Sequence, residues 1–219
     1  KIKEHESIAI AQLYHGGMRC PSDVIGMQPL SSSDNEKWGA RAMTTQEVET
    51  MISAFVTAAA RAEKAGFDGV ELHGAHGYLL AQFLSPEVNK RTDRFGGSLA
   101  NRSAPMFEII EGIRSVCGDD FMIGMRLSPE RFGMDLGEVI EIAQKLMKDG
   151  LIEFLDMSLW DVFKEAEAEE YKGQSLLSCF SQLERGDVRL GVAGKIMTPD
   201  DVEKVMGMGI DWVMLGKAG

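Results

Sequence analysis

Short apolar runs rich in β-branched residues alternate with longer segments of helical periodicity along this chain of 219 residues. The predicted strands cover residues 8–13, 69–72, 121–127, 152–157, 188–192 and 212–215. One long helix is predicted from Thr45, its expected N-cap, to Ala65, and another begins at Thr198-Pro199. Strands separated by helices require parallel crossover connections, so the pattern predicts an α/β fold with buried strands.

The residues that follow the strands favour a TIM-type (β/α)8 barrel over an open doubly wound sheet. No GxGxxG sequence follows a strand, which disfavours a Rossmann dinucleotide site. Unusual polar residues instead stand at or just beyond strand ends, where barrels carry their chemistry. These are His15, His73, His76, Arg126, Lys195 and Lys217. Only six of eight strands are found, so we expect residues 1–219 to form a single barrel domain that lacks the first two strands and the closing helix.

The charge and the cysteine content limit the classes of binding partner and the cellular compartment that we expect. Lys and Arg total 23 against 34 Asp and Glu, a formal charge of −11, which disfavours nucleic acid and anionic membrane surfaces as partners. Three widely spaced cysteines, Cys20, Cys117 and Cys179, form neither a disulfide framework nor a CxxC pair. We therefore expect a cytoplasmic protein.

The densest group of reactive side chains follows the second predicted strand, at residues 71–78. His73, His76 and Tyr78 can direct several N–H and O–H donors into one cavity, where they can polarise a carbonyl and supply a proton. Two histidines three residues apart, with Glu71 nearby, could instead hold zinc or iron. The spacing alone leaves polarising donors, a metal site and structural histidines all open.

Three segments together resemble the old yellow enzyme family of FMN-dependent NAD(P)H:flavin oxidoreductases, or ene-reductases. They are AQLYHGG at 11–17, GFDGVELHGAHGYLL at 66–80, and SP at 85–86 followed by NKRTDRFGGS at 89–98 and NR at 101–102. Their order, spacing and residue types match over about ninety positions. The pair His73 and His76 is similar to one branch of the family, in which other members carry His and Asn.

The resemblance implies a set of FMN contacts. Gln12 and Arg126 would bind the flavin ring, the arginine near N1 and O2. The phosphate would lie against Gly194, Lys195, Gly216 and Lys217, in the loops after the last two strands. Lys217 stands where the family commonly has arginine, and Met18 separates Arg19 from the glycines, so Arg19 receives no family role.

The resemblance also implies a reaction in which NADH or NADPH reduces FMN, and the flavin then reduces an enone or related activated alkene. His73 and His76 would hold the carbonyl oxygen of the α,β-unsaturated compound, and Tyr78 would protonate Cα. Residues 20–44 are expected to form a substrate-side loop. A homo-oligomer is common in the family. The alternatives are a metal-dependent barrel hydrolase or lyase that uses the two histidines, and a flavin-binding remnant without turnover.

Overall fold

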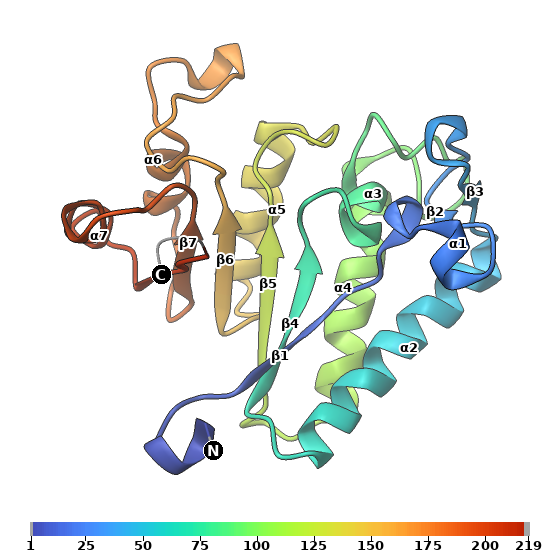
Figure 1. Ribbon diagram of the computed structural model, residues 1–219, viewed down its shortest axis with the longest axis horizontal. Helices are drawn as coiled ribbons and strands as arrows, with labels where there is room; N and C mark the ends of the chain where they lie inside the picture. Colours follow the sequence, from blue (N-terminus) through green and yellow to red (C-terminus); the bar gives the residue numbers. More distant parts are fainter. Residues whose placement is uncertain (1, 217–219) are drawn as a thin grey trace.

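The computed structural model describes residues 2–216 and contains one six-stranded parallel sheet whose strands lie in chain order (Figure 1). The strands are β1 (Ile10–Leu13), β4 (Gly69–Gly74), β5 (Met122–Leu127), β6 (Phe154–Ser158), β7 (Arg189–Ala193) and β8 (Trp212–Val213). Each predicted strand is therefore confirmed, with ends that shift by a few residues. Neighbours along the chain are neighbours in the sheet, which is the strand order of a (β/α) barrel. Among the described residues the sheet is open, with β1 and β8 at its edges.

The long helices α2 (Thr45–Lys64), α4 (Leu99–Val116) and α5 (Leu136–Lys148) cover the outer face of the sheet (Figure 1). The shorter helices are α3 (Leu79–Leu84), which lies beyond the carboxyl end of β4, α6 (Leu176–Ser181) and α7 (Pro199–Met206). Side chains alternate between the two faces of each strand. In β4, Val70 and Leu72 join the buried core, whereas the alternate residues Glu71 and His73 face the inner side of the sheet. No helix within residues 2–216 has the apolar length needed to cross a membrane.

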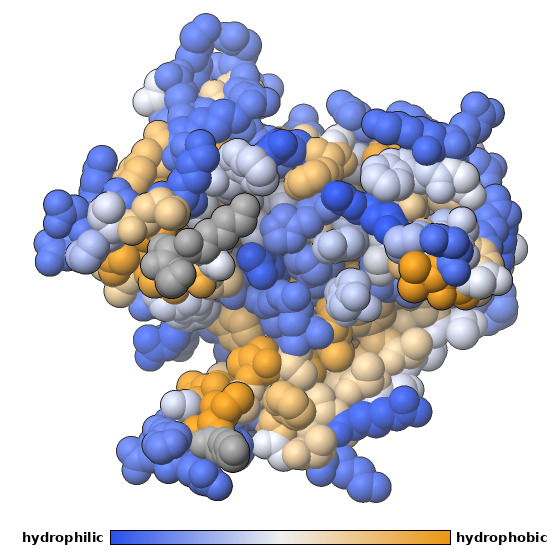
Figure 2. All heavy atoms as spheres, viewed as in Figure 1, coloured by the Kyte–Doolittle hydropathy of each residue, from blue (hydrophilic) through white to orange (hydrophobic). Residues whose placement is uncertain are grey.

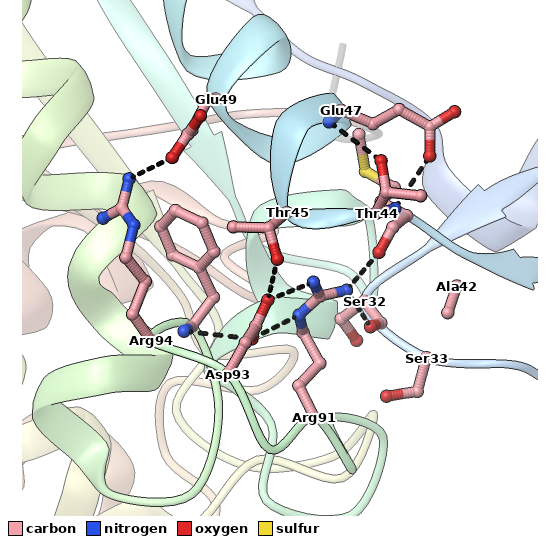
Figure 3. A network of polar contacts seen from close by, with 12 residues as sticks. Ser32, Ser33, Ala42, Thr44, Thr45, Glu47, Glu49, Arg91, Asp93 and Arg94 are labelled. Carbon is pink, nitrogen blue, oxygen red and sulfur yellow. Dashed lines mark hydrogen bonds and ion pairs between the residues drawn. The ribbon is translucent and has the colours of Figure 1, made fainter.

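The start of α2 is set by a capping box one residue before the expected cap. Thr44 Oγ1 accepts a hydrogen bond from the Glu47 amide at 3.2 Å, and Glu47 Oε2 accepts one from the Thr44 amide at 2.8 Å. Thr45 was the predicted cap, and that assignment is wrong. Its hydroxyl instead donates to Asp93 Oδ2 at 2.7 Å, which attaches the helix to a loop 48 residues away (Figure 3).

Replacing Thr44 with alanine is expected to lower the free energy of unfolding by about 1 kcal/mol, because the Glu47 amide at the start of α2 loses its hydrogen-bond acceptor. Thr57→Ala provides a matched control on the exposed side of the same helix, where alanine is the better helix former. Urea unfolding of both variants measures the difference. Equal effects at the two positions would contradict the importance of the cap.

The segment 20–44, expected to be a loop, contains short elements of its own. They are α1 (Ser22–Ile25), β2 (Leu30–Ser31), η3 (Glu36–Trp38) and β3 (Arg41–Ala42), of which β2 and β3 form a small parallel pair. The loop containing the NKRTDRFGGS sequence holds this segment in place. Arg91 donates to the carbonyls of Ser32 and Met43 and pairs with Asp93 (Figure 3). This part of the family-like sequence therefore joins the segment to α2, and its observed contacts are structural.

Candidate active site

The histidines lie at the carboxyl end of β4 and in the turn that follows it. His73 is the last inward-facing residue of the strand and is 5% exposed. His76 has a positive φ of 59°, which bulky residues rarely adopt, and its amide donates to Ser128 Oγ at 3.0 Å. The bond to Ser128, at the end of β5, fixes the turn against the neighbouring strand. The chain thus directs both imidazoles toward the same end of the sheet.

The two imidazoles contact each other directly. His76 Nδ1 lies 3.2 Å from His73 Nε2, and the ring centroids are 5.0 Å apart. Burial, followed by the charges of His76 and Arg126, lowers the pKa of His73 to about 4. Burial and the charges of Arg126 and Arg19 also lower the pKa of His76, against a smaller opposing effect of Glu71. Both rings are therefore neutral near pH 7.

A neutral pair has two tautomeric arrangements with different uses. If His73 Nε2–H donates to His76 Nδ1, the proton of His76 sits on Nε2, and that N–H is available to a ligand. His73 Nδ1 is then a bare acceptor, and this atom is buried without a hydrogen-bond partner in the described chain. In this arrangement the pair offers a ligand one N–H donor, from His76. In the other arrangement His76 Nδ1–H donates to His73 Nε2, and the buried Nδ1 of His73 carries the remaining proton. That both histidines donate to a substrate stays a prediction.

Tyr78 packs beside this pair. Its ring centroid lies 5.2 Å from that of His73 and 5.6 Å from that of Tyr14, which comes from the end of β1. Tyr78 is also the N-cap residue of α3, so its backbone is anchored by a helix that is buried along its whole length. The structure therefore brings the three predicted catalytic side chains into one cluster.

A cavity of about 340 Å³ opens next to His76, at the carboxyl ends of β5, β6 and β7. The predicted cofactor residues Arg126, Gly194, Lys195 and Gly216 all line it. Hydrophilic side chains gather in the middle of the face shown in Figure 2, whereas apolar ones gather below, over β1 and α2. A parallel sheet in chain order with a cationic cavity at its carboxyl ends is typical of (β/α) barrel proteins, which frequently bind phosphate groups at that edge.

Side chains from neighbouring strands orient the cations of this cavity. Arg126 Nε donates to Ser158 Oγ at 2.8 Å, which holds the guanidinium beside the histidines. Lys195 Nζ pairs with Asp161 at 3.0 Å and remains 61% exposed. Gly194 has a φ of 151°, and a Cβ there would come within 2.9 Å of the Asp161 amide nitrogen, so a larger residue would push two loops apart.

Backbone strain is concentrated around the same cavity. Six residues other than glycine have positive φ within residues 2–216, and all except Glu6 line the cavity. These five are His76, Arg131, Phe132, Trp160 and Lys195. Such conformations cost free energy and persist where the surrounding structure imposes them, which is typical of functional sites. Trp160 and Arg131 were not predicted, although both closely follow strand ends, where a search for site residues could have found them.

Gln12 lies on the inner face of the sheet and lines a second cavity, together with Glu71 and Asp156. Its amide Nε2 donates to Glu71 Oε2, and Glu71 in turn contacts Asp156. Burial, followed by hydrogen bonding and repulsion from Glu71, raises the pKa of Asp156 to about 8, while Arg126 and Trp212 act in the opposite direction. Asp156 is therefore protonated at neutral pH.

The carboxyl pair and Gln82 were missed by sequence reasoning. Gln82 is 1% exposed, accepts from the Met18 amide at 3.2 Å and donates to the Gly77 carbonyl at 2.7 Å. It thereby ties the loop after β1 to the histidine turn. The last predicted cofactor residue, Lys217, lies outside the described residues. No group of three or more His, Cys, Asp or Glu within residues 2–216 is arranged to hold a metal ion.

Comparisons with known proteins identify the family. Residues 1–216 match the model of the NADH:flavin oxidoreductase / NADH oxidase family, so the chain belongs to that family of FMN-dependent oxidoreductases. It is 37% identical over 99% of its length to the probable NADH-dependent flavin oxidoreductase YqiG of Bacillus subtilis, covering 61% of that protein. It is also 33% identical over 99% of its length to NADH:acrylate oxidoreductase of Vibrio harveyi, covering 23% of that protein.

The structural comparison agrees on the fold. Morphinone reductase in complex with tetrahydroNAD superimposes with a TM-score of 0.78 at 26% identity, over 96% of this chain and 62% of that one. The expected TIM-type barrel architecture of the old yellow enzyme kind is therefore confirmed. The chain spans about three-fifths of the length of YqiG and of morphinone reductase.

Proposed function

We propose that this chain forms the catalytic edge of an enzyme that uses NADH or NADPH to reduce the activated C=C bond of α,β-unsaturated carbonyl compounds. The observation that carries the proposal is the neutral His73–His76 pair with Tyr78 beside it, at the rim of a cavity lined by Arg126. Two relatives support the chemistry by name, one an NADH-dependent flavin oxidoreductase and the other an NADH:acrylate oxidoreductase.

The residues of the two cavities fit FMN. The Gln12 amide and the Arg126 guanidinium suit the alternating donors and acceptors of the flavin ring and its negative charge on reduction. Gly194, Lys195 and Gly216 supply backbone and a cation for the phosphate, while the first turn of α7 is already satisfied by its own capping box of Thr198 and Asp201. FMN, when bound, supplies the hydride that originates from the nicotinamide.

The chain's own side chains do the rest of the chemistry. His76 Nε2–H donates to the substrate's carbonyl oxygen and stabilises the negative charge that develops there as Cβ accepts a hydride. This N–H is free when His73 Nε2–H donates to His76 Nδ1, and the nearby Arg126 guanidinium adds positive charge to the site. Tyr78 then transfers its phenolic proton to Cα, which completes the net addition of H₂ across the C=C bond.

The proposal is tested with the purified enzyme, 2-cyclohexenone, and NADH or NADPH. We expect a flavin absorbance spectrum and consumption of one reduced nicotinamide for each alkene reduced. A colourless protein with stoichiometric zinc that hydrolyses or cleaves its substrate would instead support the metal-dependent alternative. A yellow protein that oxidises no NAD(P)H in the presence of any activated alkene would support the non-catalytic one.

A further inference from the structure

Arg19 lies next to two of the candidate catalytic residues, Tyr78 and His76. It ends the short helix η2 (Gly17–Arg19), which directly follows the turn after β1. Its guanidinium carbon lies 5.7 Å from the ring centroid of Trp38, 5.6 Å from that of Tyr78 and 5.6 Å from that of Phe132. These rings come from three separate segments: η3, the turn after β4, and the loop after β5. The positive charge is therefore enclosed by aromatic faces, which attract cations through the ring quadrupole.

The contacts of Arg19 differ from those of the structural arginines. Arg91, Arg102 and Arg114 each pair with a carboxylate that holds them in place. The Arg19 guanidinium forms no ion pair with any carboxylate in the described part of the chain, and its one side-chain hydrogen bond there is from Nη1 to the His76 carbonyl at 2.5 Å. A guanidinium carries five N–H donors in a planar fork, so most of its capacity to bind an anion remains unused.

The position of this guanidinium relates it to the reacting bond. The Tyr78 ring contacts both groups: its centroid lies 5.6 Å from the Arg19 guanidinium carbon and 5.2 Å from the His73 imidazole centroid. The backbone bond to His76 holds Arg19 against the same turn. Trp38 and Phe132 are each more than a third exposed, which places the aromatic group at the mouth of the site. An anion bound by Arg19 would lie beside Tyr78, at the edge of the cavity that Phe132 lines together with Arg126 and Lys195.

We propose that Arg19 is a specificity-determining residue that binds a carboxylate carried by the substrate in addition to its activating carbonyl group. The enzyme would then favour α,β-unsaturated compounds bearing a second, anionic group over their neutral esters. The aromatic rings hold the guanidinium and shield its charge from water, and the N–H fork offers bidentate geometry that a lysine lacks. This inference rests on the proposed function, because it assumes that the alkene reacts beside Tyr78.

Monomethyl fumarate and dimethyl fumarate test the proposal, since the two differ in one negative charge. The quantity measured is the ratio of kcat/KM for the monoester to that for the diester. We expect this ratio to fall at least tenfold in Arg19→Met, which keeps length and loses charge, and by less than about threefold in Arg19→Lys. In Arg61→Met, a control on the exposed surface of α2, the ratio should not change. An unchanged ratio in Arg19→Met, even with lower activity on both esters, would overturn the proposal and leave Arg19 a structural clamp.

A binding measurement separates failure of this inference from failure of the proposed function. Monomethyl succinate and dimethyl succinate have no C=C bond, and calorimetry reports their dissociation constants without turnover. We expect the wild-type enzyme to bind the monoester at least tenfold more tightly than the diester, and Arg19→Met to abolish the difference. If neither fumarate ester is reduced but the difference in affinity between the two succinates is observed, the result supports the anion site and contradicts the proposed reaction. Equal wild-type affinity for the two succinates would overturn the anion site whatever the enzyme reduces.

Discussion

Replacing Tyr78 with phenylalanine is expected to slow alkene reduction by about 10²–10⁴-fold, the range typical of a lost general acid. Reduction of the enzyme-bound flavin by NAD(P)H should change by less than about threefold, because that step needs no proton from the phenol. Phenylalanine retains the ring that packs against His73 and Arg19, so the packing of the cluster is preserved. The change therefore isolates the hydroxyl group.

Rapid-mixing spectroscopy measures the two half-reactions separately through the flavin absorbance. Tyr14→Phe is the matched control, because Tyr14 is the second phenol of the cluster, lies 5.6 Å from Tyr78 and is 63% exposed. Its loss should leave alkene reduction within about threefold of wild type. An equal loss in both half-reactions of Tyr78→Phe would show that the residue supports flavin binding and is not the proton donor.

Much of the architecture could be predicted because strand and helix periodicity are local properties of a sequence. All six strands were found, and the alternation of Val70, Glu71, Leu72 and His73 already separates an apolar outer face from a polar inner one. The cap at Thr44 was missed because Thr44 and Thr45 are equivalent caps by type. Only the contact of Thr45 with Asp93, 48 residues away, decides between them.

The details of the site were harder to predict because they depend on contacts across strands. The sequence predicted that His73 and His76 point into one cavity, but it could not show that one nitrogen of each ring contacts the other ring. Nor does any local pattern pair Glu71 with Asp156, which lie on different strands with β5 between them. Their meeting follows from the register of three parallel strands, and register is a tertiary property.

The Glu71–Asp156 pair makes the stability of the protein depend on pH in an unusual direction. The folded state keeps Asp156 protonated up to about pH 8, whereas an unfolded aspartate releases its proton near pH 4. Between these values the folded state binds more protons, so this group's contribution to the free energy of unfolding falls as pH rises. We expect Asp156→Asn, which cannot ionise, to remove this loss. The free energy of unfolding of this variant relative to wild type should rise by on the order of 3 kcal/mol between pH 5 and pH 8.

Chemical unfolding at pH 5, 6, 7 and 8 measures the effect. Asp119→Asn, at an exposed aspartate, is the control and should follow the wild-type dependence on pH. Glu71→Gln should reproduce part of the Asp156→Asn effect, because removing the neighbouring carboxylate lowers the pKa of Asp156 while burial still raises it. The free energy of unfolding of the double variant should rise by less than the sum of the two single effects, since both substitutions remove the same repulsion. A stability difference between Asp156→Asn and wild type that stays constant from pH 5 to pH 8 would show that the folded state does not keep Asp156 protonated in this range.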